Sequence, residues 1–140
     1  MSVYLDVNAL VPLFVADLLT ERAEKALGGL RDDLIVSNFS TAEFSAVIAR
    51  RVRTRDLRAD EATAAFLNFD AWCSRHTQRA ELEGGDIAGA TGLMRRFDLS
   101  LRTPDALHIA MVQRLGCRLL SFDRGMTKVA RTLGVALAKG

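Results

Sequence analysis

Residues 1–10, MSVYLDVNAL, place a carboxylate where a buried strand should end. Val3–Leu5 is typical of a core strand, and Asp6 follows it directly. The same pattern recurs in residues 117–126, CRLLSFDRGM, where a second apolar run is followed by Asp123. Both acids would therefore lie at strand ends, and their purpose depends on how these strands are arranged.

Length and composition indicate an ordinary globular protein. With 140 residues, 49% apolar and 26% charged, we expect one domain spanning residues 1–140. A chain of this size buries roughly two-thirds of the surface that its unfolded form exposes. No apolar run approaches the roughly 20 residues that a membrane helix needs. The N-terminal residues do not show the basic region followed by an apolar stretch that is typical of an export signal. We therefore expect a cytoplasmic protein that binds no membrane.

The basic residues are mostly arginine, at a net charge of +2. The planar guanidinium suits phosphate and carboxylate groups, so this bias is compatible with an anionic partner. A GC-rich genome would produce the same bias. Cys73 and Cys117 fall in helix and strand patterns without metal-ligand spacing, and we expect buried, reduced thiols.

Short apolar runs alternate with helical patterns along the chain. Strands are expected at Val3–Asp6, Leu34–Ser37, Arg118–Phe122 and Val135–Leu137. Helices are expected at about Ala9–Val15, Thr20–Leu30, Thr41–Arg53, Ala59–Gln78, Asp86–Phe97, Pro104–Leu115 and Arg124–Leu133. This alternation predicts an α/β fold with a parallel sheet covered on both faces. Such sheets bind ligands outside the carboxyl ends of their strands, where Asp6 and Asp123 would lie.

The longest helical pattern carries an apolar stripe that indicates either core or a subunit interface. Its members are Ala62, Ala65, Phe66, Phe69, Trp72 and Cys73.

Two acids near the sheet edge also have purely structural explanations. Asp6 or Asn8 could cap the helix expected near Ala9, and Asn8 fits this cap well. Glu43 follows Ser40 at the spacing of a capping box, in which Glu43 would reach back to the Ser40 amide. Glu43 also borders the apolar face of its helix, so its side chain could instead point towards the sheet.

Two further acids have similar alternatives. Asp105 follows Thr103 and Pro104, a standard helix start with Thr103 as N-cap. His108 lies one turn later and could ligate a metal, although a histidine here is more often a core or hydrogen-bonded residue. Asp123 could cap the helix that follows it.

The four acids together favour a shared function. Carboxylates gathered at one rim of a sheet repel and raise each other's pKa unless a cation holds them. Oxygen ligands suit Mg²⁺ and Mn²⁺, whereas zinc sites usually recruit Cys or His. A metal held in this way is typical of enzymes that act on phosphodiesters, where it generates a hydroxide nucleophile and offsets charge on the developing phosphorane.

Four segments also resemble a known family. YLDVNAL (residues 4–10), TAEF (41–44), RTPDALHIA (102–110) and LLSFDRGM (119–126) occur in the order and approximate spacing of the PIN-domain nucleases. The chain is most similar to the VapC-type toxins of bacterial toxin–antitoxin pairs, over essentially its whole length. The resemblance implies a PIN-like three-layer α/β/α sandwich with a central parallel sheet of four to five strands. It also implies Mg²⁺- or Mn²⁺-dependent cleavage of RNA.

The family's acidic quartet matches four positions of this chain, namely Asp6, Glu43, Asp105 and Asp123. The resemblance implies that Asp6 and Asp105 ligate the principal metal. Glu43 would ligate it too, or would position and deprotonate the attacking water. Asp123 would complete the cluster, mainly for a second metal that arrives with substrate.

Supporting roles are implied for other residues near these acids. Asn8 stands where the family often has Thr or Ser, and would orient Asp6 or a metal-bound water. Ser121 is a further candidate for supporting the ligands. Arg102 and Arg124 adjoin the acids in sequence and are candidates for contacting RNA phosphate.

A second arginine cluster has two interpretations. It comprises Arg50, Arg51, Arg53, Arg55 and Arg58. These residues form either a phosphate-tracking surface or a solvated helix end, where cations also suit the helix dipole.

The resemblance also implies partners. A small VapB-like antitoxin would lay its C-terminal segment across the site, and the toxin would be a homodimer. Nothing in this chain matches a DNA-reading motif, so promoter DNA would be bound only through the antitoxin.

Three other functions remain to be weighed. A catalytically weak PIN subunit could act mainly as the binding half of an antitoxin-dependent repressor complex, but the intact acids argue against this. A phosphorylation receiver needs an acceptor Asp ending a middle strand and a Lys ending a later one, and Leu34–Ser37 provides no such acid. A haloacid-dehalogenase-type phosphatase needs D-x-D, and Asn8 occupies the second position.

Overall fold

A parallel sheet of four strands forms the centre of the molecule. The computed structural model describes all residues, Met1–Gly140. The strands are β1 (Ser2–Leu5), β2 (Asp33–Ser37), β3 (Thr77–Ala80) and β4 (Arg118–Leu120), in the order β3-β2-β1-β4. All three pairings are parallel. The carboxyl ends of β1 and its neighbours therefore open onto one edge.

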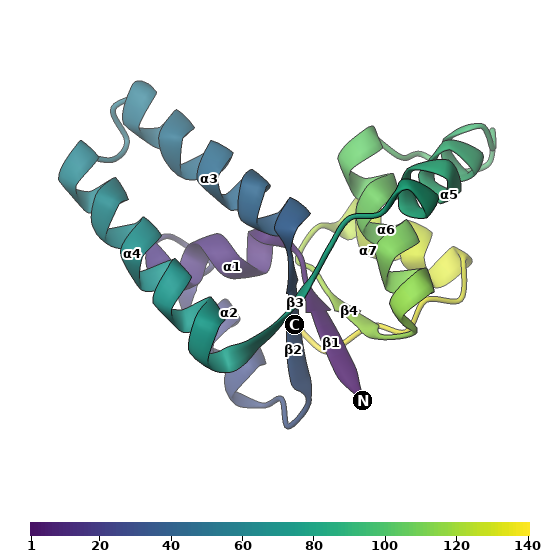
Figure 1. The fold of residues 1–140 in the computed structure, drawn as a ribbon, viewed down its shortest axis with the longest axis horizontal. Helices are drawn as coiled ribbons and strands as arrows, with labels where there is room; N and C mark the ends of the chain where they lie inside the picture. The colour runs from purple at the N-terminus through teal and green to yellow at the C-terminus, as the bar shows by residue number, and fades with distance from the viewer.

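Seven helices cover both faces of this sheet. They are α1 (Val7–Phe14), α2 (Thr20–Gly28), α3 (Asn38–Arg53), α4 (Ala59–His76), α5 (Gly84–Met94), α6 (Thr103–Leu115) and α7 (Arg124–Thr132). Figure 1 shows α1–α4 on one side of the strands and α5–α7 on the other. The expected three-layer α/β/α sandwich is confirmed. None of the helices combines the length and apolar character needed to cross a membrane.

The side chains of β1 alternate between the two cores. Val3 and Leu5 pack with apolar residues of α1, α3 and α4, whereas Tyr4 packs with residues of α6 and α7. This alternation follows from the two-residue period of a strand. β1 is a central strand and is buried on both faces. Asp6 directly follows its last residue, so it lies in the middle of the sheet edge.

Two expected elements differ from the structure. The helix expected over Ala59–Gln78 ends at His76, and the unpredicted edge strand β3 begins immediately after it. Gln78 and Arg79 of β3 are exposed, so the strand has no apolar alternation that could reveal it. The strand expected at Val135–Leu137 is reduced to one bridge, between Leu119 and Leu137.

The apolar stripe of α4 belongs to the core. Phe69 is buried and stacks on Phe44 of α3 with ring centroids 4.0 Å apart, while Phe66 and Trp72 pack half-buried against the same cluster. The stripe therefore needs no partner subunit to explain it. Cys73 and Cys117 are free thiols; Cys117 is buried and Cys73 is half-buried, and burial raises the pKa of Cys73 to about 11.

Candidate functional site

Asp6 ends β1 and begins α1 at the same time. Its backbone amide still donates to Leu120 of β4 (3.0 Å), while its Oδ1 accepts from the Val7 amide (2.7 Å). Of the two caps that the sequence offered, Asp6 is confirmed and the better-fitting Asn8 is wrong, because α1 begins two residues earlier than predicted. Asp6 is only 5% exposed, so its carboxylate faces into the protein.

Ser121 connects the acid of β1 to the loop after β4. Its hydroxyl donates to Asp6 Oδ2 (2.7 Å) and accepts from the Asn8 side-chain amide (3.2 Å) and the Asp123 backbone amide (3.1 Å). These contacts use the one donor and both acceptor sites of a serine hydroxyl. Asn8 also accepts from the Phe122 amide (3.0 Å). Asn8 therefore supports Asp6 through Ser121, and makes no direct hydrogen bond to it.

Glu43 is free to enter the site because it takes no part in helix capping. The predicted capping box with Ser40 is wrong: α3 begins at Asn38, directly after β2, and its N-cap is Ser37. The Ser37 hydroxyl accepts from the Ser40 amide at 2.9 Å. Glu43 consequently lies one turn inside α3, on the side that faces the sheet edge.

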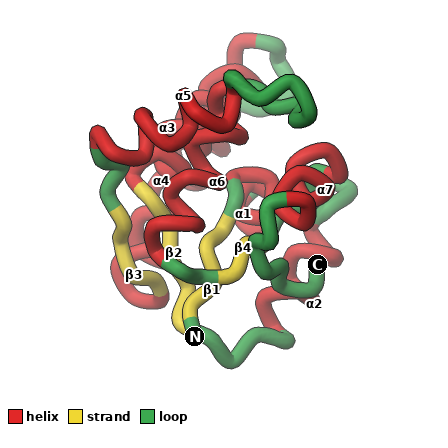
Figure 2. The backbone as a smooth tube through the Cα atoms, turned by 90° about the vertical axis from the view of Figure 1, so that its right-hand side faces the viewer, coloured by secondary structure: helices red, strands yellow, loops and turns green.

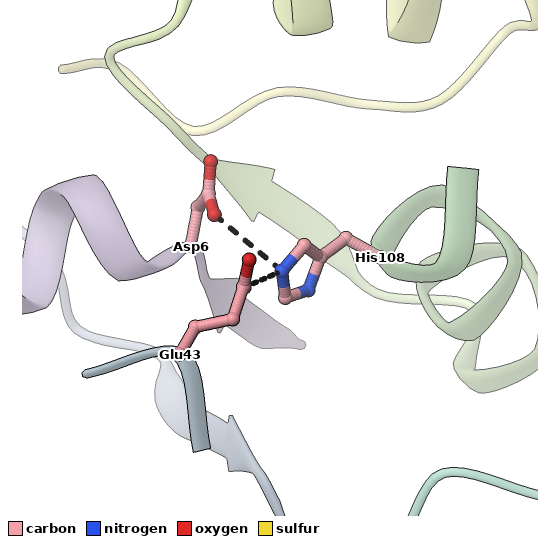
Figure 3. A group of neighbouring side chains, drawn as sticks. All are labelled: Asp6, Glu43 and His108. Carbon is pink, nitrogen blue, oxygen red and sulfur yellow. Dashed lines mark hydrogen bonds and ion pairs between the residues drawn. The ribbon is translucent and has the colours of Figure 1, made fainter. Parts of the chain in front are cut away.

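His108 of α6 joins Glu43 and Asp6, as Figure 3 shows. Its ring is fully buried; Nε2 contacts Glu43 Oε1 and lies 3.7 Å from Asp6 Oδ1. Its Nδ1 lies 2.6 Å from the Tyr4 hydroxyl, which in turn lies 2.7 Å from Ser37 Oγ. A chain of polar contacts thus runs from β2 through β1 to the acids.

A hydrogen bond from His108 to an ionised Glu43 requires a hydrogen on Nε2. An ionised carboxylate can only accept, so Nε2 carries the hydrogen. In the neutral imidazole, Nδ1 then accepts from the Tyr4 hydroxyl, whose pKa burial raises. His108 therefore donates a hydrogen bond to Glu43. Of the roles expected for it from the sequence, this is the hydrogen-bonded one and not the metal ligand. Tyr4 reads in the sequence as an ordinary core strand residue, and no local signal indicates that it would orient this ring.

Of the four predicted acids, Asp6 and Glu43 belong to this close group, whereas Asp105 and Asp123 do not. Asp105 is in the first turn of α6, whose N-cap is Arg102 and not Thr103 as predicted. Burial raises the pKa of Asp105, and the charges of Asp123 and Asp6 raise it further, while Arg102 opposes the shift. The negative charges of Asp123 and Asp6 therefore disfavour ionisation of Asp105. Asp123 caps α7 as expected, with its Oδ1 accepting from the Met126 amide at 3.0 Å.

The cluster offers oxygen ligands for a hard cation. Asp6, Glu43 and His108 each present a potential ligand atom, and these atoms all lie within 4.8 Å of one another. Burial raises the pKa of Asp6 and the charge of Glu43 adds to this, against lowering by His108, Ser121 and the Val7 amide. Carboxylate oxygens fit Mg²⁺ or Mn²⁺. The Nε2 hydrogen of His108 points at Glu43, so this arrangement presents oxygen ligands and no imidazole lone pair.

Arg102 and Arg124, the two candidates for contacting RNA phosphate, both lie at the surface. Arg102 is 83% exposed and its Nε lies 3.8 Å from Asp105 Oδ2. Arg124 is the exposed first residue of α7. In the second arginine cluster, Arg51 pairs with Asp17 at 3.4 Å, so part of that cluster is a solvated, ion-paired helix end.

Comparison with known proteins gives a family and a set of similar folds. The model of the PIN domain family matches residues 3–132. Mycobacterium tuberculosis VapC20, a sarcin-ricin loop cleaving toxin, has 17% identity and a TM-score of 0.74, with 91% of this chain and 94% of that chain covered. FitAcB from Neisseria gonorrhoeae has 14% identity and a TM-score of 0.72, with 98% and 96% covered.

A third similar structure comes from a complex with DNA. VapBC2 from Rickettsia felis, bound to a DNA fragment from its promoter, has 13% identity and a TM-score of 0.68, with 98% of this chain and 97% of that chain covered. No curated protein sequence matched. At these identities the structures establish a shared fold, and the family model spans nearly all of the described elements. The chain belongs to the PIN domain family.

Proposed function

We propose that this protein is a Mg²⁺- or Mn²⁺-dependent endoribonuclease and the toxin of a type II toxin–antitoxin pair. The observation that carries the proposal is the buried Asp6 at the end of β1, which Ser121 and the His108–Glu43 pair surround. Buried carboxylates whose pKa is raised by burial and by one another favour a bound cation. Membership of the PIN domain family supports the same chemistry.

Each acid has a role in the proposed hydrolysis. A bound metal would supply an activated water and would offset charge at the phosphate and leaving oxygen. Asp6 and Asp105 are the proposed principal ligands, and Asp123 completes the acidic rim. The proposed role of Glu43, which contacts His108, is to orient the attacking water and accept its proton. Ser121 and Asn8 keep the Asp6 carboxylate in one orientation.

The proposed partners follow from the similar structures. VapC20 is described as a toxin that cleaves the sarcin-ricin loop; the R. felis VapBC2 structure contains a promoter DNA fragment, and a FitAB structure contains an IR36 DNA fragment. We propose that residues 1–140 act as a single PIN domain in the cytoplasm, as a homodimer that a VapB-like antitoxin inhibits. Promoter DNA would be contacted through that antitoxin.

The test is cleavage by the purified chain, free of antitoxin. Total RNA is incubated with the protein in Mg²⁺ or Mn²⁺, beside samples containing EDTA and beside the Asp105→Asn variant. Discrete cuts that need metal and disappear with the variant are expected, and their mapped positions would identify the target RNA.

The competing function is a repressor subunit with little activity. In that case a folded, metal-loaded wild-type protein would cut no RNA, and Asp105→Asn would leave growth inhibition and promoter binding in cells unchanged. Either result would contradict the nuclease.

A further inference from the structure

A basic cavity lies beside the acidic cluster, on the side of α7. It has a volume of about 640 Å³ and is bounded by α2, by the β4–α7 connection and by residues 137–140. Figure 2 shows α2, α7 and the C-terminal segment gathered at this side of β4. The volume lies within the roughly 300–1,000 Å³ of typical ligand sites. Four of its lining residues carry positive charge, namely Arg22, Arg124, Arg131 and Lys139.

The charge of this basic pocket is not neutralised by acidic side chains. No Asp or Glu side chain lines it, and none of its four cations lies within ion-pair distance of a carboxylate. Elsewhere arginines such as Arg51, Arg114 and Arg118 are paired. Unpaired cations around a concave wall focus a positive potential that attracts anions.

Arg22 is held in the pocket by an aromatic ring. Its guanidinium carbon lies 4.3 Å from the centroid of Phe122, with no acid beside it. A cation–π contact orients the guanidinium but, unlike an ion pair with a carboxylate, does not use its N–H groups as hydrogen-bond donors. Those donors remain free for a ligand, and the planar fork of arginine matches phosphate oxygens.

The pocket adjoins the proposed active site through Ser121. Ser121, which donates to Asp6, also lines the pocket, and Arg124 directly follows Asp123. A chain of phosphates that crosses the acids would therefore leave the acidic rim at the α7 side. There the unpaired cations of the pocket would meet it, whereas Arg102 on the α6 side is partly engaged by Asp105.

We propose that this basic pocket binds backbone phosphate of a single-stranded RNA next to the bond that is cut. The assignment rests on the proposed function for its substrate class, and it adds Arg22, Arg131 and Lys139 as binding residues. Single-stranded RNA is favoured over duplex DNA because the pocket is a concavity lined in part by the aromatic side chain of Phe122. The guanidinium fork also matches the carboxylates of an acidic protein segment; RNA is favoured as the ligand because the pocket shares Ser121 with the proposed active site.

The test compares two double variants of equal charge. Arg131→Gln/Lys139→Gln removes two pocket cations, and Arg75→Gln/Lys128→Gln removes one arginine and one lysine outside it. All four side chains are exposed and unpaired, and Lys128 shares α7 with Arg131. Both pairs are made in the Asp105→Asn background to prevent cutting. Binding of a labelled single-stranded RNA of random sequence is then measured by fluorescence anisotropy over a range of salt.

We expect the pocket variant to bind RNA roughly tenfold more weakly at moderate salt. The slope of log Kd against log salt should fall by about 1.4, since each phosphate contact on a single strand contributes about 0.7. The control variant should lose less RNA affinity and should keep a steeper slope of log Kd against log salt. Equal losses in the two variants would overturn the proposal.

Two further outcomes would reassign the ligand. If duplex DNA bound more tightly than RNA with the same dependence on Arg131 and Lys139, the RNA assignment would be overturned. The same holds if the pocket variant lost antitoxin binding and kept RNA binding. The wild-type protein could also fail to cut RNA while the two double variants still differ in RNA binding. That result would refute the proposed nuclease activity, but the RNA-binding pocket would stand.

Discussion

The Ser121 hydroxyl donates to the Asp6 carboxylate at 2.7 Å, across 115 positions of the sequence. This hydrogen bond ties the end of β1 to the loop after β4, and it uses the Asp6 oxygen that the α1 amide leaves free. The two strands are neighbours in the sheet, so their ends meet without a long loop. The central carboxylate of the site is therefore oriented from two elements.

Ser121→Ala is expected to impair metal binding more than folding. The variant leaves Asp6 Oδ2 without its donor and removes an acceptor from Asn8 and Asp123. Metal affinity should fall by about 10- to 100-fold, as is typical when a ligand loses its supporting contact. The free energy of unfolding should fall by about 1 kcal/mol. Calorimetric Mn²⁺ titration and chemical denaturation measure the two effects.

Ser45→Ala is the matched control for this variant. Ser45 is exposed on α3 and its hydroxyl bonds only the Thr41 carbonyl at 2.9 Å. Unchanged Mn²⁺ affinity in Ser121→Ala would show that Ser121 does not support the metal site.

Asp105→Asn is expected to abolish cleavage while stabilising the metal-free protein. Burial and the charges of Asp123 and Asp6 raise the pKa of Asp105, so its ionised form is unfavourable without a cation. The neutral amide removes that repulsion. RNA cleavage should fall by at least about 100-fold, the scale seen when one electrostatic group of an active site is lost. Thermal unfolding in EDTA should shift to a higher temperature, and added Mn²⁺ should stabilise the variant less than the wild type.

Metal binding is expected to weaken as the pH falls, beginning above the usual range of an aspartate. Burial raises the pKa of Asp6, and only the ionised carboxylate binds a cation. Protons therefore compete with metal at pH values above the ordinary aspartate pKa of about 3.9. Mn²⁺ affinity measured at pH values between about 8 and 4 tests this. An affinity that stays constant down to the ordinary aspartate pKa contradicts it.

In the metal-free protein, Asp6 should affect folding stability with the opposite dependence on pH. A folded pKa above the unfolded value means that the folded state holds its proton more tightly. The contribution of Asp6 to stability is thus greatest below its unfolded pKa and is lost as the pH rises through its folded pKa. Asp6→Asn should flatten this loss in EDTA, and Asn at this position still provides a good N-cap.

Tyr4→Phe is expected to reduce cleavage with little loss of core packing. The ring is fully buried, and the missing hydroxyl removes the donor to His108 Nδ1 and a partner of Ser37. Without that donor, the proton can move to Nδ1 and the His108–Glu43 contact is lost. We expect the rate of cleavage to fall by roughly 10-fold or more, with a destabilisation of about 1 kcal/mol. The ring nitrogen shifts of His108 in nuclear magnetic resonance spectra would report the tautomer, and an unchanged spectrum would refute this role.

Arg114→Met tests the packing of α5 on α6, away from the site. Arg114 Nε and an NH2 group donate to the buried Asp86 at 2.7 and 2.9 Å, and hold the pKa of that carboxyl below its usual range. Removing the arginine leaves a buried acceptor and costs roughly 2 kcal/mol of stability at neutral pH. Because the folded pKa of Asp86 is lowered, the wild-type advantage should be present above the unfolded pKa and disappear as the pH falls through the folded pKa.

Arg96→Met provides the control for that experiment. Arg96 pairs with Asp98 at an exposed position, and such pairs contribute little to stability. Equal destabilisation by the two variants would contradict the importance of the buried Asp86 contact.

Local patterns in the sequence predicted much of the fold. The apolar runs at β1, β2 and β4 and the helical patterns between them gave the order of strands and helices and the parallel sheet. Helix starts were less certain, because one segment held two residues able to cap. Ser37 is the cap of α3 where Ser40 had been expected, and of the two candidates for α1 the cap is Asp6 and not Asn8, since β2 and β1 pass into their helices almost without a loop. The polar edge strand β3 gave no periodic signal.

The sequence by itself determined the acids at the strand ends, because a carboxylate after an apolar run is a local feature. Only the tertiary structure decided how they are held. The His108–Glu43 contact, the Ser121–Asp6 hydrogen bond and the basic pocket of Arg22, Arg124, Arg131 and Lys139 all join residues that lie far apart in the chain. Such contacts depend on strand order and on which face each helix turns to the sheet. Those choices minimise the free energy of the whole packed core, and no single segment encodes them.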